Sequence, residues 1–246
     1  MLSNDQVIDA IALATETENI VMSGEKRAYN QFKVTSQHGG SITAYALGCN
    51  LRCVYCWCYD LITNLVPTNF YSPLEVARKL VGVDLISKRR FRISGSEPIL
   101  GEKSLKHIIS IIEHLSTIVS EKFEFFIETN GIILDQYPEL LSIIPSSDRG
   151  IIGVDVKIQV SLKSWDEESF NQITGCRGFS SQISTIRRLK THNIPFSVIV
   201  LKNILEKHKD QIVTLIGNDI KIETESLMLT SEIMDRLMTV GLNNVF

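Results

Sequence analysis

Short apolar segments that suit β-strands alternate along this chain with segments of helical periodicity, and this alternation does most to restrict the fold. Strands are expected at 42–47, 91–94, 123–128, 195–201 and 220–229, with the fourth strand in chain order falling on 151–156 or on 158–162. Antiparallel strands need no helix between them, so strands joined by helical crossovers indicate a parallel sheet. The chain is therefore expected to be an α/β protein.

Helix start signals support the same arrangement. Ser72 precedes Pro73 and stands three residues before Glu75, which is the pattern of an N-cap followed by a capping box. Further helices are expected near 104–119, after Ser164 and near 181–192. The first forty residues fit the alternation less well, although a helix near 5–15 is expected there. We therefore divide the chain into an N-terminal extension, 1–40, and a main domain, 41–246.

Composition and charge limit the class of function. The chain has 246 residues, 44% of them hydrophobic, which is enough for one large core and does not require a second. Its net charge of -3 argues against a broad nucleic-acid surface, and the basic segments at 88–90 and 187–188 are expected to be solvated. The acidic first thirty residues resemble no leader, and no apolar run approaches the roughly 20 residues of a membrane span. A cytoplasmic protein with no membrane or nucleic-acid partner is expected.

Cys49, Cys53 and Cys56 lie close together directly after an apolar segment. A cubane iron–sulfur cluster uses one protein ligand per iron, so three thiolates would leave one iron open to a small molecule. Structural zinc is the alternative, with Cys58 as the fourth thiolate, but zinc sites usually pair two hooks across a longer stretch. Cys176 stands alone, and the odd number of cysteines disfavours disulfides.

The spacing C-x3-C-x2-C, with Tyr55 before the last cysteine, resembles the cluster loop of the radical S-adenosylmethionine (SAM) enzymes. Three further segments resemble motifs of that family, and each follows an expected strand: 94–98, 128–131 and 161–163. The carboxyl ends of parallel barrel strands are where such folds build their sites. The resemblance implies a partial (β/α)6 parallel barrel preceded by an N-terminal helical extension, with a 4Fe-4S cluster and SAM as cofactors.

The resemblance also implies site residues. Cys49, Cys53 and Cys56 would hold the cluster. Gly95, Ser96 and Glu97 match the Gly-Gly-Glu-Pro segment that holds the methionine amino group, although Ser94 and Ser96 stand where that segment has glycine. The remaining residues implied to bind the cofactors are Tyr55, Glu128, Asn130, Ser161 and Lys163. Ser161 replaces an aspartate of the family pattern, and Lys157 offers a competing match for Lys163.

The function implied is reductive cleavage of SAM to methionine and a 5'-deoxyadenosyl radical, with the electron supplied by a donor such as ferredoxin or flavodoxin. Compact activating enzymes are the most similar members, which implies a protein or peptide substrate that receives a glycyl radical. A second hypothesis is an enzyme like 7-carboxy-7-deazaguanine synthase, although Trp57 and Cys58 replace the Asp-Thr expected after its last cysteine. A third, non-enzymatic hypothesis is a zinc-stabilised binding module.

Overall fold

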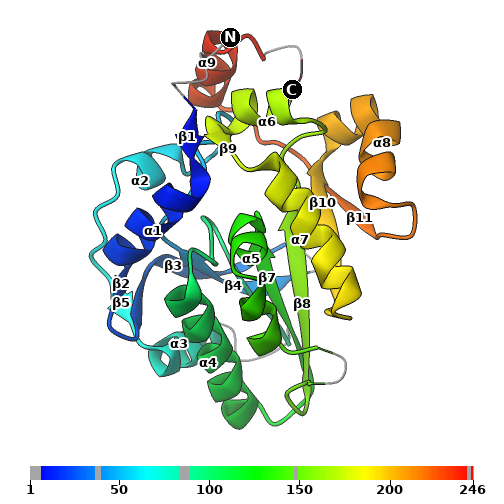
Figure 1. The fold of residues 1–246 in the computed structure, drawn as a ribbon. Coiled ribbons are helices and arrows are strands. Elements are labelled where there is room, and N and C mark those ends of the chain that lie inside the picture. Colours follow the sequence, from blue (N-terminus) through cyan, green and yellow to red (C-terminus); the bar gives the residue numbers. More distant parts are fainter. Residues whose placement is uncertain (1–6, 37–39, 84–88, 147–148, 243–244, 246) are drawn as a thin grey trace.

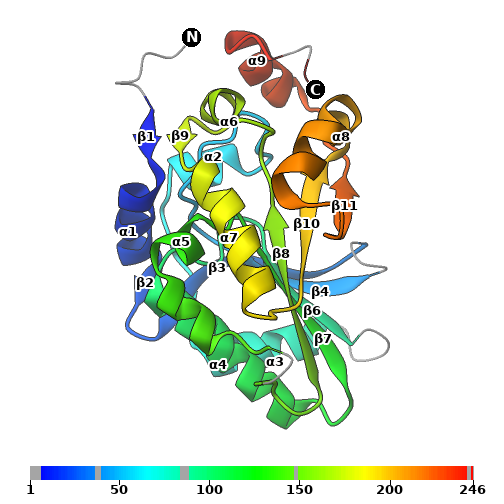
Figure 2. The same cartoon turned by 45° about the vertical axis from the view of Figure 1, so that its right-hand side comes forward.

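The computed structural model describes residues 7–36, 40–83, 89–146, 149–242 and 245. Six parallel strands run from one edge of its main sheet to β4. In spatial order they are β4 (Ser41–Ala46), β6 (Arg90–Ser94), β7 (Phe123–Thr129), β8 (Val154–Ser161), β10 (Phe196–Leu201) and β11 (Ile222–Glu225). Figures 1 and 2 show helices α4, α5 and α7 over one face of this sheet, with α8 beside β10 and β11. The α/β fold with a partial parallel barrel is confirmed.

Helices connect the parallel strands as the sequence predicts. They are α2 (Tyr59–Thr63), α3 (Pro73–Val83), α4 (Glu102–Ile118), α5 (Ile132–Gln136), α6 (Glu167–Thr174), α7 (Phe179–Thr191) and α8 (Lys202–Ile216), with a 3-10 helix at Pro138–Ile143. Helix α9 (Ser231–Thr239) follows the last parallel strand. The capping box before α3 is formed, because Glu75 accepts hydrogen bonds from the backbone N–H and hydroxyl of Ser72 at 2.7 and 2.9 Å. Within the described residues, no helix is long and apolar enough to cross a membrane.

The fourth parallel strand joins the two segments that the sequence suggested as alternatives. β8 pairs continuously with β7, from Val154 opposite Phe123 to Val160 opposite Thr129. The charged residues Asp155 and Lys157 lie on the same face of β8 as Ser161, toward the amino end of the strand, where they form ion pairs with Lys122 and Glu124. Alternation across a strand places such side chains in solvent while their neighbours are buried.

The N-terminal extension contains more structure than the expected helix. Helix α1 spans Ala10–Val21 rather than 5–15, because Asp9 caps it by accepting from the backbone N–H groups of Ile11 and Ala12. Residues 5 and 6, at the start of the expected helix, lie outside the described residues. Strand β3 (Lys26–Thr35) then pairs antiparallel with β4, and the short strands β2 (Met22–Ser23) and β5 (Phe70–Tyr71) pair with β3.

Arg27 shows how this extension supports the rest of the fold. Its guanidinium is fully buried and donates to the carbonyl oxygens of Pro98, Glu97 and Leu47. These carbonyls belong to the segments that follow β4 and β6. A buried charge needs such partners to offset its desolvation, so Arg27 ties the extension to the strand ends of the barrel.

Candidate functional site

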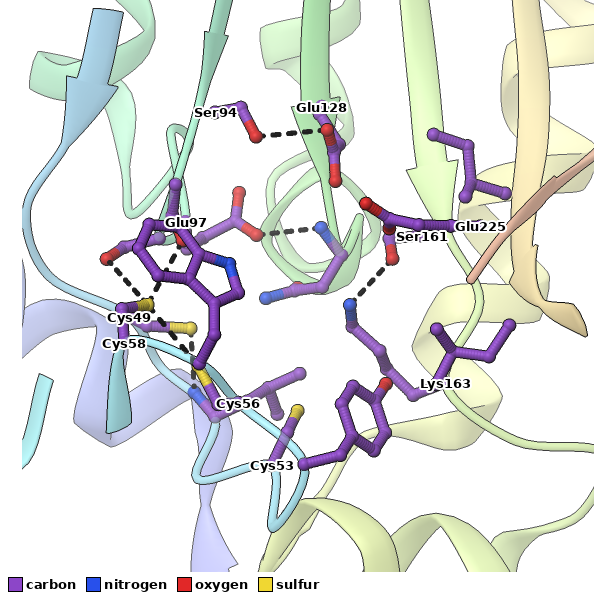
Figure 3. A pocket seen from close by; sticks show the side chains of 18 of the residues that line it. Cys49, Cys53, Cys56, Cys58, Ser94, Glu97, Glu128, Ser161, Lys163 and Glu225 are labelled. Carbon is purple, nitrogen blue, oxygen red and sulfur yellow. Dashed lines mark hydrogen bonds between the residues drawn. The ribbon is translucent and has the colours of Figure 1, made fainter. Parts of the chain in front are cut away.

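A cavity of about 420 Å³ opens at the carboxyl ends of the parallel strands. This volume falls within the range of small-molecule sites. Figure 3 shows the cysteines on one side of it, with Ser161, Lys163 and Glu225 across from them. Every residue that the sequence predicted for the site lines this cavity: Cys49, Cys53, Tyr55, Cys56, Gly95, Ser96, Glu97, Glu128, Asn130, Ser161 and Lys163.

The cysteine loop is held by backbone contacts on both sides. Gly48 enters the loop with φ of +87°, and a Cβ there would lie 2.6 Å from the side chain of Thr17 in α1, so only glycine fits. The short strand β1 (Ile8–Asp9) pairs with β9 (Cys176–Arg177) beside the loop. The N–H groups of Arg52 and Val54 donate to carbonyls of α6 at 2.8 and 2.9 Å. The loop conformation is therefore imposed by packing as well as by its own sequence.

The thiols differ in their surroundings. Burial raises the pKa of Cys53 to about 12 and that of Cys49 well above its usual value. The Cys56 thiol lies 3.3 Å from that of Cys58, and this hydrogen bond lowers the pKa of Cys56 to about 7 and raises that of Cys58. Cys58 also contacts the carbonyl of Gly95 at 3.2 Å. Cys58 thus bridges the cysteine loop and the segment after β6.

The donor set is compatible with an iron–sulfur cluster. In the part of the chain that the structure describes, no group of three or more His, Cys, Asp or Glu side chains converges as one ion requires. A cubane instead binds each thiolate through a different iron, so its ligands lie around the cluster rather than around one point. Three thiols along one wall of a cavity, with polar groups opposite, match the requirements of a cluster with one open iron.

Glu97 is the most constrained carboxylate of the site. Its oxygens accept hydrogen bonds from the backbone N–H of Ile99 at 2.9 Å, the hydroxyl of Thr129 at 2.5 Å and the N–H of Asn130 at 2.7 Å. Burial nevertheless raises the pKa of this carboxyl to about 7, because desolvation outweighs the three donors. Gly95, two residues before Glu97, has a φ of +100° and packs against Tyr45. A Cβ at Gly95 would lie 2.8 Å from the side chain of Tyr45, so this position favours glycine.

Asn130 is likewise engaged inside the protein. Its amide nitrogen donates to Asn50 of the cysteine loop at 2.7 Å, and its amide oxygen accepts from the N–H of Ile132. Asn50 in turn donates to the carbonyl of Ala10 at the start of α1. This chain of amides joins the strand end of β7 to the cysteine loop and to the N-terminal helix.

Lys163 rather than Lys157 points into the cavity. Its ammonium donates to the hydroxyl of Ser161 at 2.6 Å. Burial alone would lower its pKa, but the nearby Tyr55, Cys53 and Glu128 outweigh that effect and raise it. Lys157 is 43% exposed and pairs with Glu124 outside the cavity. The competing match for Lys163 is therefore excluded from the site.

Sequence reasoning missed three charged residues of the cavity, which are Lys33, Arg92 and Glu225. Arg92 on β6 is 6% exposed, forms an ion pair with Glu128 and donates to Ser94 at 2.9 Å. Glu225 at the end of β11 has a raised pKa, first because of burial and then because of Glu128. An arginine two residues before Ser94, on the same face of a strand whose other face carries Phe91 and Ile93, was the signal available for Arg92. Glu225 had no comparable signal.

The chain matches known proteins over most of its length. The model of the radical SAM superfamily matches residues 44–216. A GTP 3',8-cyclase of Thermodesulfovibrio yellowstonii is 33% identical over 161 residues, which is 63% of this chain and 45% of that protein. The molybdenum cofactor biosynthesis protein moc-5 of Caenorhabditis elegans is 30% identical over 63% of this chain and 24% of its own length. The chain thus spans less than half the length of these two relatives.

Solved structures agree on the fold. SuiB of Streptococcus suis bound to S-adenosylmethionine matches 75% of this chain and 40% of its own, with a TM-score of 0.55 and 15% identity. Native anSMEcpe with bound AdoMet matches 74% of this chain and 49% of its own, with a TM-score of 0.53 and 18% identity. The chain belongs to the radical SAM superfamily, a family of enzymes that use a 4Fe-4S cluster and S-adenosylmethionine.

Proposed function

We propose that this chain holds a site-differentiated 4Fe-4S cluster through Cys49, Cys53 and Cys56 and binds SAM beside it for reductive cleavage. One observation carries the proposal: the three thiols and the polar groups at the ends of β6, β7 and β8 line the same cavity. When bound, the cluster would supply the electron that converts SAM to methionine and a 5'-deoxyadenosyl radical, which abstracts hydrogen from a substrate.

The charges of the cavity suit the two ends of the methionine part of SAM. Lys163 carries a buried ammonium near the carboxylate of Glu128, and a SAM carboxylate would give it a further charged partner. Glu97 has a pKa of about 7 and would ionise more readily beside the SAM amino group. Glu128, held by Arg92, places a further carboxylate between these two.

Apolar side chains complete the cavity and limit its access to water. Leu51, Leu162, Ile199 and Leu201 lie in its walls and are at most 9% exposed. A closed cavity limits the side reactions of a reactive radical, because it keeps other hydrogen donors away from it. The chain's own contribution is therefore to orient SAM, to hold the charges and to exclude solvent.

The substrate of the proposed reaction is either a protein or a small molecule. A protein substrate that receives a glycyl radical is supported by the segment from Ser161 to Gly175, which resembles the activating enzymes. A small-molecule substrate is supported by the GTP 3',8-cyclases among the relatives and by the deazaguanine-synthase resemblance of the cysteine loop. In either case a ferredoxin- or flavodoxin-type donor would supply the electron.

We expect the iron-loaded protein, reduced with dithionite under anaerobic conditions, to release 5'-deoxyadenosine and methionine slowly from SAM without any substrate. Uncoupled cleavage needs only cluster, electron and SAM. Liquid chromatography with mass spectrometry measures both products, and Cys53→Ala serves as the control without a complete cluster. Cluster-loaded, reduced protein that consumes no SAM, alone or with any candidate substrate, would rule the activity out.

The same assay separates the substrate classes. A glycyl-radical partner peptide labelled with deuterium should transfer the label into 5'-deoxyadenosine if the protein-substrate hypothesis holds. GTP or a tetrahydropterin should instead accelerate the release of 5'-deoxyadenosine if the substrate is a small molecule. Each result supports one hypothesis and contradicts the other.

Lys163→Ala is expected to weaken SAM binding by about 10- to 100-fold while iron content stays unchanged, because one charge-assisted hydrogen bond is lost and no metal ligand is removed. Calorimetric titration of iron-loaded protein with SAM measures the effect. Lys157→Ala is the matched control, since its ammonium pairs with Glu124 outside the cavity. Normal SAM affinity in Lys163→Ala, or weakened affinity in Lys157→Ala, would remove Lys163 from the site.

A further inference from the structure

The C-terminal helix α9 is packed against the cysteine loop. The chain leaves β11, and residues 226–228 follow the wall of the cavity before α9 begins. Thr230 caps the helix by accepting from the N–H of Ile233, and Ile233 and Leu237 are buried. Figures 1 and 2 show α9 beyond the carboxyl ends of the strands β8 and β10. The cysteine loop therefore has a neighbour that is remote in sequence.

Arg236 makes the polar contact between this helix and the loop. Its Nε donates to the carbonyl of Val54 at 2.9 Å, and its Nη2 donates to the carbonyl of Cys56 at 2.8 Å. The guanidinium also lies 4.6 Å from the centre of the Tyr59 ring. The planar fork of an arginine donates to two carbonyls from two nitrogens in a fixed geometry, which the single nitrogen of a lysine does not provide. Arg236 thus fixes the backbone of one predicted cluster ligand.

This contact places a permanent positive charge beside the loop. Arginine remains protonated at all ordinary pH values. Reduction adds an electron to a cluster that already carries three thiolates, so a nearby cation favours the reduced state over the oxidised one. The net charge around a cluster and the hydrogen bonds near its sulfurs are among the factors that set its reduction potential.

We propose that Arg236, held in α9 against the carbonyls of Val54 and Cys56, is a positioning residue that raises the reduction potential of the cluster. The inference rests on the proposed function, since it requires a cluster on Cys49, Cys53 and Cys56. SAM cleavage needs a reduced cluster, so the C-terminal helix would determine how easily a physiological donor can start the reaction. A purely structural role would fasten α9 without changing the potential.

The test is a potentiometric titration of iron-loaded protein without SAM, followed by electron paramagnetic resonance and normalised to bound iron. Arg236→Gln should lower the equilibrium constant for reduction by about tenfold, which is about 59 mV for one electron. Arg236→Lys keeps the charge and should shift the potential less. Lys190→Gln, which removes a surface cation paired with Asp219, should leave the potential unchanged.

An unchanged potential in Arg236→Gln would overturn the inference, as would equal shifts in Arg236→Gln and Arg236→Lys, because lysine retains the charge. If Arg236→Gln holds no iron, Arg236→Lys decides: iron with a nearly wild-type potential supports the inference, and loss of iron contradicts it. Wild-type protein that binds no iron would instead remove the proposed function itself. The two failures are therefore distinguishable.

Discussion

Replacement of Cys49, Cys53 or Cys56 by alanine, one at a time, is expected to abolish the broad visible absorbance and most of the bound iron of anaerobically reconstituted protein. Each thiolate would bind a different iron, so the loss of one leaves two protein ligands for a cluster of four irons. Absorbance spectra together with iron and sulfide analysis measure this. No iron in the reconstituted wild type would contradict the cluster outright.

Cys58→Ala and Cys176→Ala are the matched controls for this experiment. Cys58 lies 3.3 Å from the thiol of Cys56, so it shares the environment of the cluster loop without being a predicted ligand. Cys176 is buried and its thiol contacts the carbonyl of Asn50. Both variants should keep the absorbance. An equal loss in Cys58→Ala would make Cys58 part of the metal site and would favour a four-thiolate or zinc centre.

Arg92→Met is expected to lower the free energy of unfolding by about 3–5 kcal/mol, because it leaves the carboxylate of Glu128 buried without its charged partner. Urea denaturation of the protein without cofactors measures the change. Arg89→Met is the matched control. The side chains of Arg89 and its partner Glu121 are 47% and 58% exposed, so their ion pair should contribute about 0–1 kcal/mol to the free energy of unfolding. Equal effects of the two substitutions would contradict a buried pair at Arg92.

The Arg92–Glu128 pair also makes the stability of the protein depend on pH. Burial acts to raise the pKa of Glu128, but Arg92 and its hydrogen bond outweigh burial and hold that pKa below its usual value. A carboxyl with a lowered folded-state pKa contributes stability above the unfolded pKa of about 4.5, and this is lost as the pH falls through the folded value. Arg92→Met should remove this contribution, so its deficit relative to wild type should shrink in acid.

Several parts of the fold could be predicted from local sequence. The apolar segments at 42–47, 91–94, 123–128 and 195–201 are strands in the structure, with ends that differ by at most one residue. Such segments are buried on both faces, so their composition alone distinguishes them. The parallel order follows because helices connect them. The convergence of the predicted site residues on one cavity follows in turn, since parallel strands end at one edge.

The N-terminal part shows where local signals fail. The segment of β3 contains Arg27, Asn30, Gln31 and Lys33 among its apolar residues, so its alternation is weak. It becomes a strand because β4 offers a free edge for pairing. Helix α1 begins at Ala10 because Asp9 supplies its N-cap. The strand β3 depends on a partner that its local pattern does not reveal, whereas the cap of α1 lies within two or three residues of the groups that it binds.

By itself, the sequence determined the parallel α/β arrangement and the cysteine loop, because periodicity and ligand spacing are properties of neighbouring residues. Tertiary structure alone decided which charged groups enter the cavity and what they face. Arg92 meets Glu128 across 36 positions, and Arg236 meets Cys56 across 180. A charged side chain has the same local pattern whether it is solvated or buried against a partner. Only the packing of distant elements removes water and makes such a pair energetically important.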